Sequence, residues 1–438
     1  MNSTNTKQRW STKTAWVVLG LLLVLFVVAL MLLHKIPEDY PYSIRGENYQ
    51  FMGPFWVVLN YDSRAFMRGA EDLTEILTPD YMRQSRPGMV VVAHFVSKAL
   101  GPAVTWVERV LASTGRQFHA PIDRWLHQYV AYIAINLTVV LLSFWYYIKL
   151  AGSKKSISIA AVAAGALLLF NIISKAFMLT PHTAILELLV PLAVLDLFLR
   201  VRRADSIKQS KLIPYSVVFG LAAIGYTGVL IAAPAAVLAE ILNRRDDLDK
   251  KGWARFPWWG SLATLIMLLP IVAWITFISV RNQGFYVAEF EGEELVWLVE
   301  AVRDNVIQAI ALLGTKIWRL TWMALQQTWP LLLTVVSVVT AIGPKTVWQQ
   351  FKGEARKDLP VGAVIVSGLS ILFFALIGLT NLRRAYLAVP SLIVLLGWFL
   401  ERLSGELPDS QQPRFPLAVA TALVVTAIIF FIQQGPYW

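Results

Sequence analysis

The sequence predicts an all-α protein that crosses a membrane many times, through about eleven helices. Of its 438 residues, 57% are hydrophobic and only 15% are charged, whereas soluble domains carry about 25% charged residues. The first apolar run, residues 16–33, is nearly unbroken and has close to the roughly 20 residues that a helix needs to cross the bilayer. It lacks a small-residue cleavage site and Lys35 follows it, so we predict a retained helix rather than a signal peptide.

The remaining apolar runs place the other spans and leave the whole chain, 1–438, as one integral membrane domain. Around Gly225–Gly228 a single kinked helix is an alternative to two spans. The predicted spans lie at 15–34, 126–149, 156–177, 182–199, 212–226, 228–243, 257–280, 328–344, 360–380, 385–401 and 415–433.

Basic residues are concentrated in the short connections on the N-terminal side of these spans. Examples are Lys13, Lys154, Arg203 and Arg245. Lysine and arginine favour cytoplasmic loops, so we predict a multi-pass protein of the cytoplasmic (inner or plasma) membrane with a cytoplasmic N-terminus. The same bias accounts for the net charge of +11, and no nucleic-acid partner is expected. The absence of cysteine excludes disulfides and thiol chemistry.

Two larger segments, 35–125 and 281–329, fall on the opposite, extracytoplasmic side. In the first, residues 63–77 have the period of an amphipathic helix, with Asp62 or Ser63 at the N-cap position. Residues 87–101 form a second predicted helix, too short to span, and residues 104–114 form a third. We expect these helices to lie in the membrane interface. In segment 281–329, the residues around Trp318 and Trp322 suggest another interfacial helix, for which an aromatic belt is the simpler explanation.

Asp62 has two interpretations from residue type alone. Its carboxylate can accept backbone N–H groups at a helix start, a contribution of about 1 kcal/mol. A carboxylate at the membrane interface can also serve as a general base towards a hydroxyl group. The two roles are compatible, because a helix N-terminus orients the carboxylate and favours its ionised form.

The order of several motifs resembles that of a known family. Asp62 is followed by Phe66 and Ala70, then by "YMRQSRPGMVVVAHFVSKALGP", "TPHTAILELLVPLAVLDLFLR", "GLAAIGYTGVLIAAPAAVLAEIL" and "RRAYLAVPSLIVLLGWFLERL". This succession covers nearly the whole chain. It is similar to the polyprenyl-phosphate-sugar-dependent glycosyltransferases of the GT-C type, which include protein O-mannosyltransferases and aminoarabinose lipid A transferases. The resemblance implies a GT-C-like fold.

The resemblance also implies roles for individual residues. Asp62 matches the catalytic acidic residue, and Arg383 or Arg384 matches the basic residue beside the lipid phosphate. Many relatives carry an acidic pair near the end of the first span, where this chain has Glu38 and Asp39. Asp39 therefore remains a competing candidate for the base. The late motif also departs from the pattern, because Ala385 separates Arg384 from Tyr386.

Physical chemistry adds further candidates for binding a lipid phosphate and its sugar. Arginine pairs with phosphate through two parallel hydrogen bonds and stays charged. Arg383 and Arg384 lie at an extracytoplasmic mouth, against the positive-inside trend, and interfacial snorkelling is the alternative explanation. The other substrate-binding candidates are Arg86 and Arg83 in the first segment, Lys175 and His182 at the turn after the third span, and Tyr386. Glu187 is expected to face the bundle interior, and Asp196 is expected to pair with nearby arginines.

No cofactor is expected. The five histidines show no ligand spacing, and the acidic run at 289–294 is more typical of a solvated loop than of a cation site. Neither a glycine-rich phosphate loop nor a Ser-His-Asp order is present, which disfavours a nucleotide-consuming enzyme.

These observations together predict an inverting glycosyltransferase that transfers a hexosyl or pentosyl group. The expected donor is a polyprenyl-phosphate-linked sugar, and the acceptor is a glycan, lipid or protein outside the cytoplasmic membrane. A transporter or lipid-linked sugar flippase is the main alternative, although no internal repeat of the kind common in transporters is found. A polysaccharide polymerase or ligase and a purely structural membrane protein also remain open.

Overall fold

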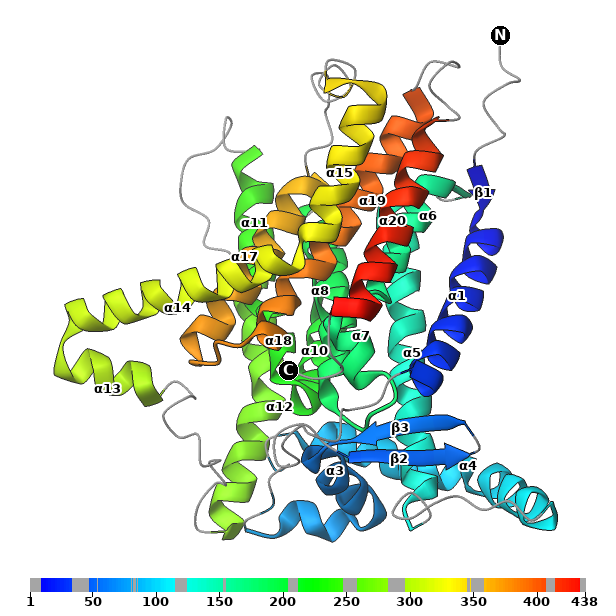
Figure 1. Ribbon diagram of the computed structural model, residues 1–438. Helices are drawn as coiled ribbons and strands as arrows, with labels where there is room; N and C mark the ends of the chain where they lie inside the picture. The colour runs from blue at the N-terminus through cyan, green and yellow to red at the C-terminus, as the bar shows by residue number, and fades with distance from the viewer. Residues whose placement is uncertain are drawn as a thin grey trace.

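The computed structural model of the protein is a bundle of long helices with a smaller group of elements at one end (Figure 1). The structure describes residues 9–33, 47–52, 54–79, 81, 84, 86–114, 124–152, 155–203, 212–246, 258–282, 296–344, 347, 358–406 and 414–433. The bundle contains α1 (Thr12–Leu33), α5 (Leu126–Ala151), α6 (Ile159–Gly165), α8 (Leu186–Arg202), α10 (Leu212–Gly225), α11 (Ala232–Asp246), α12 (Trp258–Asn282), α15 (Trp329–Ile342), α17 (Asp358–Leu376), α19 (Val389–Glu406) and α20 (Arg414–Gln433).

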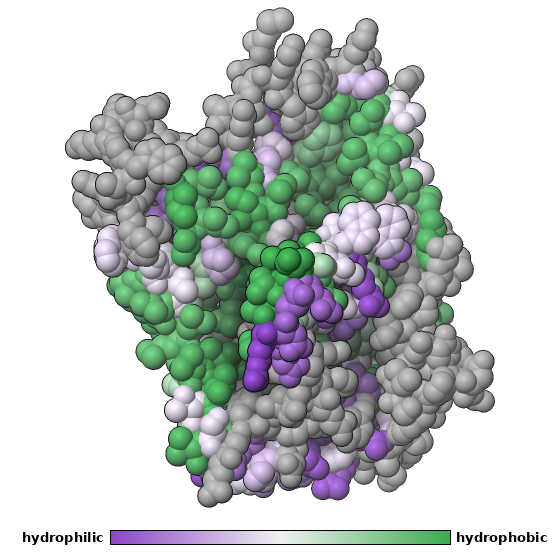
Figure 2. Space-filling view, turned by 90° about the vertical axis from the view of Figure 1, so that its left-hand side faces the viewer, coloured by the Kyte–Doolittle hydropathy of each residue, from purple (hydrophilic) through white to green (hydrophobic). Residues whose placement is uncertain are grey.

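The outer surface of the bundle is apolar, as a lipid environment requires. On α1, the side chains of Leu19, Leu23 and Phe26 are buried against the bundle, whereas Leu21 and Leu25 on the opposite side are exposed. A helix that is hydrophobic all round belongs in a core or a membrane. Figure 2 shows broad areas of hydrophobic side chains on the side of the molecule turned to the viewer. The protein is therefore an all-α, multi-pass membrane protein.

The described part of the chain contains six helices that are long and apolar enough to cross a membrane. A seventh span is obtained if the pair α14 (Val306–Gln327) and α15, bent by 52°, counts as one. The long helices are Thr12–Leu33, Pro87–Ser113, Leu126–Ala151, Trp258–Asn282, Asp358–Leu376 and Leu382–Ser404, and the shorter apolar helices are Ile159–Leu168, Leu212–Gly225, Thr227–Asn243 and Ala418–Ala427.

Each of the eleven predicted spans coincides with helical structure, but several are broken. The predicted span 156–177 consists of β4 (Ser156–Ser158), α6, the 3-10 helix η2 (Ala166–Leu168) and α7 (Ile172–Phe177). Of the two alternatives around Gly225–Gly228, the structure has two separate helices and not one kinked helix. The first, α10, ends at Gly225, and the 3-10 helix η4 (Thr227–Ile231) leads into the second, α11.

The first large segment forms a compact group at the end of the bundle remote from the N-terminus (Figure 1). An antiparallel hairpin of β2 (Glu47–Met52) and β3 (Phe55–Leu59), which the sequence did not predict, leads into α3 (Tyr61–Glu71) and η1 (Leu73–Leu77). Next comes α4 (Pro87–Ser113), which runs across the end of the bundle.

Two predictions for this segment are wrong. The sequence indicated separate helices at 87–101 and 104–114, yet α4 is continuous, with Pro102 inside it, and it is long enough to span. An internal proline removes one backbone hydrogen bond, and an otherwise helical segment in a membrane protein tolerates that loss. The N-cap of α3 is Asn60, not Asp62 or Ser63.

The second segment contains α13 (Val296–Asp304) and α14, which project from the side of the bundle (Figure 1). Trp318 and Trp322 of α14 are both exposed and stack with ring centroids 6.5 Å apart. This confirms a helix at the predicted position. Its inner end approaches the candidate site, because the Gln327 side-chain amide donates to the Leu382 carbonyl at 2.5 Å.

Candidate functional site

A polar cluster lies where the first segment meets the bundle, and a turn anchored by α5 forms its base. The Asn136 amide of α5 donates to the carbonyls of Phe177, Met178 and Thr180, at 2.9, 3.2 and 3.1 Å. The Thr180 hydroxyl in turn donates to the Val58 carbonyl of β3 at 2.9 Å. The turn after α7 is thus fixed to both the bundle and the hairpin.

His182 follows this turn and contacts Asp62. Its Nδ1 accepts the backbone N–H of Ala184 at 2.8 Å, which caps the 3-10 helix η3 (Thr183–Ile185). Its Nε2 lies 3.1 Å from Oδ2 of Asp62. A nitrogen that accepts a hydrogen bond carries no proton, so the ring proton of the neutral imidazole is on Nε2 and is donated to Asp62.

The position of Asp62 in α3 leaves its carboxylate available for this contact. The Asn60 side chain accepts the backbone N–H of Ser63 at 2.8 Å, and the Ser63 hydroxyl completes a capping box with the backbone of Asn60. Asp62 lies in the first turn of the helix, where the macrodipole stabilises negative charge. The capping interpretation of Asp62 is therefore wrong, because the neighbouring asparagine supplies the cap.

Aromatic rings enclose His182, which is 1% exposed. The Phe66 ring of α3 meets it edge to face at 5.7 Å, and the Phe177 ring lies 4.6 Å away on a tilted plane. Tyr132 of α5 packs on Phe66 and donates its hydroxyl hydrogen to the Phe66 carbonyl at 3.2 Å. The imidazole is thus held in a single orientation by apolar contacts on its faces and hydrogen bonds at both nitrogens.

Arg86 reaches the cluster from the start of α4. Its guanidinium donates to the Thr183 hydroxyl at 2.9 Å, next to His182 in the chain. A close approach of backbones positions this end of α4: a Cβ atom on Gly88 would stand 2.9 Å from the backbone nitrogen of Gly225 in α10. Only a residue without a side chain fits there.

The neighbouring residues Arg383 and Arg384, in α18 (Leu382–Ala385), have different surroundings. Arg384 is 3% exposed and donates to Glu187 Oε1 at 2.9 Å, and its guanidinium lies 3.5 Å from the Tyr226 hydroxyl. Arg383 is half-buried over the Phe177 ring at 5.5 Å, and its buried Nε has no hydrogen-bond partner among the described residues.

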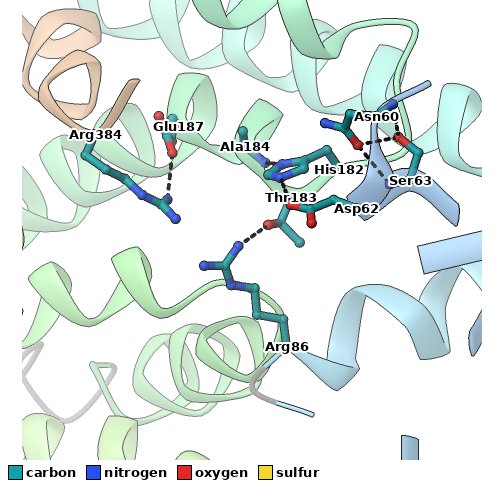
Figure 3. A network of polar contacts seen from close by, with 9 residues as sticks. All are labelled: Asn60, Asp62, Ser63, Arg86, His182, Thr183, Ala184, Glu187 and Arg384. Atoms are coloured by element: carbon teal, nitrogen blue, oxygen red, sulfur yellow. Dashed lines mark hydrogen bonds and ion pairs between the residues drawn. The ribbon is translucent and has the colours of Figure 1, made fainter. Parts of the chain in front are cut away.

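These groups meet in one network drawn from distant parts of the chain. Figure 3 shows the side chains of Asp62, Arg86 and Arg384 directed towards the same region from three different elements. Arg383 is close enough to Asp62 for their opposite charges to interact. The structure thus places Asp62 and these arginines at the same end of the bundle.

The other predicted residues have varied surroundings. Lys175 is buried in α7, and Tyr386 is buried at the start of the 3-10 helix η6 (Tyr386–Ala388), where its hydroxyl has no hydrogen-bond partner within the described residues. Arg83, Asp39 and the acidic run 289–294 lie outside the described residues. In the part of the chain that the structure describes, no three His, Asp or Glu side chains are grouped as metal ligands would be.

Sequence reasoning did not identify Asn136, Thr183 or Asn60 as parts of this cluster. Asn136 had a usable signal, since an amide within an apolar span must find hydrogen-bond partners. Asn60 had one as well, because Asn-X-X-Ser is compatible with a capping box. Asp196 was expected to pair with arginines, and it does contact Arg200 at 2.8 Å.

Comparisons with known proteins give a distant likeness to a solved structure. No family model and no curated protein matches the chain. The chain is similar to the crystal structure of ArnT from Cupriavidus metallidurans bound to undecaprenyl phosphate, with 17% sequence identity and a TM-score of 0.49, over 95% of this chain and 71% of that one. A likeness this distant assigns no activity to the chain.

Proposed function

We propose that the protein is an inverting glycosyltransferase that uses a polyprenyl-phosphate-linked sugar as donor. The observation that carries this proposal is the contact of Asp62 with His182 beside Arg86 and Arg383. An oriented carboxylate next to arginines at one end of an apolar bundle combines a base with phosphate ligands. The order of the sequence motifs supports the same class.

Asp62 is the proposed general base. Its carboxylate takes the proton from the acceptor hydroxyl as that oxygen bonds to the anomeric carbon of the donor. The bond between this carbon and the phosphate oxygen breaks, and polyprenyl phosphate leaves with the electron pair. A single displacement from the opposite face inverts the anomeric configuration. His182 acts as a positioning residue, because its Nε2–H fixes the orientation of the carboxylate.

Arg383 and Arg86 are the proposed ligands of the lipid phosphate. Arg384 is not among the proposed ligands, because Glu187 neutralises it in a buried pair. Arg383 offers a guanidinium whose Nε is unsatisfied within the described residues and whose plane is supported by Phe177. Arginine at both positions suits a dianionic leaving group, which it can bind through paired hydrogen bonds.

The proposed site faces the outer side of the cytoplasmic membrane, where the acceptor is a glycan, a lipid or a protein. This orientation follows from the basic residues at the other end of the bundle. The donor's prenyl chain would remain in the bilayer.

The test is sugar transfer by the purified protein from a panel of lipid-linked sugars. We expect Asp62→Asn to lower kcat by about 10²–10⁴-fold, the usual contribution of a general base, while donor binding persists. Arg383→Gln should mainly raise the KM for the donor. Asp72→Asn is the matched control, because Asp72 caps η1 in the same segment and asparagine caps equally well.

Two results would overturn parts of this proposal. If Asp62→Asn keeps near wild-type activity and Asp39→Asn does not, then Asp39 is the base. Movement of the sugar-lipid across proteoliposomes without a new glycosidic bond would instead establish a transporter or flippase.

A further inference from the structure

Three side chains of α13 and α14 donate hydrogen bonds to one short segment, residues 376–382, which connects α17 to α18. The donors are Trp297 of α13 and Lys316 and Gln327 of α14, and the acceptors are the carbonyls of Leu376, Gly378 and Leu382, at 2.9, 3.3 and 2.5 Å respectively. The two projecting helices therefore hold this connection at its beginning, in its middle and at its end.

The accepting carbonyls belong to a helix end that cannot satisfy them itself. α17 ends at Leu376, and the last four carbonyls of an α-helix have no partner within the helix. Gly378 has a φ of 81°, the left-handed conformation that commonly ends a helix and favours glycine. Carbonyls at such a turn need donors from elsewhere in the protein, because the bilayer interior offers none. α13 and α14 supply those donors.

Lys316 also joins the two helices to each other. Its ammonium nitrogen lies 4.5 Å from the centre of the Trp297 ring, within the range of an attractive cation–π contact. Lys316, Leu320, Ala324 and Gln327 follow one another at helical spacing, so they share one face of α14. On this face Leu320 and Ala324 are buried, and α14 packs against α17, α18 and η6. Lys316 and Gln327 therefore contact the connection from a face that is already packed on it.

The end of the connection carries Arg383. The residue before it, Leu382, is held through its carbonyl by Gln327 of α14. The residue after it, Arg384, is held through its side chain by Glu187 of α8. The backbone of Arg383 is thus fixed from both sides, by two helices that do not themselves contain it. Loosening the contact with α14 would shift the guanidinium of Arg383 relative to the rest of the polar cluster.

We propose that α13 and α14 position Arg383 for the lipid phosphate, with Lys316 and Gln327 as positioning residues. This inference rests on the proposed function, in which Arg383 binds the phosphate of the donor. Both residues act through the backbone that carries the arginine. The base is held separately, because the turn before His182 is anchored by Asn136 and by β3. Loss of the α14 contacts should therefore weaken donor binding and leave the chemical step unchanged.

The experiment measures sugar transfer by the purified full-length protein and, separately, its binding of polyprenyl phosphate by native mass spectrometry. We expect Lys316→Met to raise the donor KM and the Kd for polyprenyl phosphate about tenfold, close to the effect of one hydrogen bond from a charged group, at unchanged kcat. Lys316→Arg, which keeps a cation with N–H donors, should restore most of the affinity. Arg319→Met, a matched loss of a cation at an exposed position of the same helix, should behave like the wild type.

Hydrogen exchange tests the hold on the connection without any measurement of activity. The backbone amides of residues 377–384 should exchange faster in Lys316→Met than in the wild type, and at the wild-type rate in Arg319→Met. If Lys316→Met does not fold, Gln327→Met gives the same test, because it removes the donor to the Leu382 carbonyl and keeps the length of the side chain.

The outcomes separate this inference from the proposed function. If the wild type neither transfers sugar nor binds polyprenyl phosphate, both are wrong. If the wild type does both and Lys316→Met keeps the wild-type KM and Kd, the positioning role is wrong and the proposed function stands. Equal losses in Lys316→Met and Arg319→Met would show a general attraction of the lipid to positive charge. A fall in kcat at unchanged KM would show that these contacts serve the chemical step instead, and either result would overturn the positioning role.

Discussion

At the residue scale, the two nitrogens of His182 have separate tasks. Nδ1 caps η3 and Nε2 holds Asp62. Forming an imidazolium would place a proton on Nδ1 and break the hydrogen bond from Ala184, so the fold favours the neutral ring. A neutral donor orients the carboxylate but does not compete with the acceptor hydroxyl as a proton source. This makes His182 well suited to position a general base.

Substitution of His182 can separate these two tasks. His182→Asn keeps an acceptor near Nδ1 and preserves the cap, but its amide is too short to reach Asp62. We expect kcat to fall by about 10- to 100-fold, as for the loss of one hydrogen bond to a charged group. His182→Gln, whose amide nitrogen reaches the Nε2 position, should recover most of the activity. Equal activity of the two variants would contradict the positioning role.

Adjacent residues can differ completely in burial and partner. Arg383 and Arg384 are equivalent candidates in the sequence, but only Arg384 meets Glu187, which lies 197 residues away in the chain. A buried ion pair of this kind is costly to break, because the remaining charge would be uncompensated. The difference between Arg384, which is held in an ion pair, and Arg383, the proposed phosphate ligand, therefore arises from tertiary contacts.

At the element scale, close packing of α4 against α10 positions Arg86. The start of α4 meets the end of α10 at Gly88 and Gly225, and the Trp274 indole of α12 donates to the Gln84 carbonyl at 2.7 Å just before α4. The loop that carries Arg86 is thus fixed from both sides. A small displacement of this junction would move a proposed phosphate ligand.

Alanine substitution in α4 tests this packing. Gly88→Ala places a Cβ atom 2.9 Å from the Gly225 nitrogen and 3.1 Å from its Cα. Because neither backbone atom can yield locally, we expect a loss of about 1–3 kcal/mol in stability and a raised donor KM. In the control, Gly101→Ala in the same helix, the new Cβ meets nothing closer than 3.8 Å, so activity should be retained. Normal stability and KM in Gly88→Ala would rule out this role for the junction.

At the scale of the whole molecule, the bundle separates two polar regions. The cluster around Asp62 lies at the end that carries α3 and α4, and a cavity lined by Lys149, Arg200 and Arg203, among others, lies at the end where α1 begins. Positive charge gathered at one end is what the positive-inside rule produces. The proposed chemistry would then take place on the face of the membrane opposite these basic residues.

Labelling of single cysteines tests this orientation directly, because the chain has no cysteine of its own. Thr14→Cys introduces an exposed thiol near the start of α1, and Ser113→Cys introduces one at the end of α4. In intact cells we expect a membrane-impermeant maleimide to label Ser113→Cys only, and to label Thr14→Cys after permeabilisation. The reverse pattern would show that the topology is inverted and would place Asp62 on the cytoplasmic side.

The sequence by itself determined the class of fold and much of the composition of the candidate site. Apolar runs report membrane spans because the bilayer admits only segments that are apolar and satisfy their own backbone hydrogen bonds. Asp62, His182, Arg86 and the pair Arg383 and Arg384 were all candidates, since a polar side chain in such a chain needs a specific reason.

Only the tertiary structure decided how these residues are used. It assigned the α3 cap to Asn60, gave Arg384 to Glu187, and joined two predicted helices into α4. It also brought together tryptophans and arginines from helices far apart in the chain, at the end of the bundle where α1 begins. Hydrophobic periodicity in the sequence indicates which residues are shielded from water. Which polar side chains pair with each other depends on the distances between helices in the folded protein, and a local sequence pattern does not contain those distances.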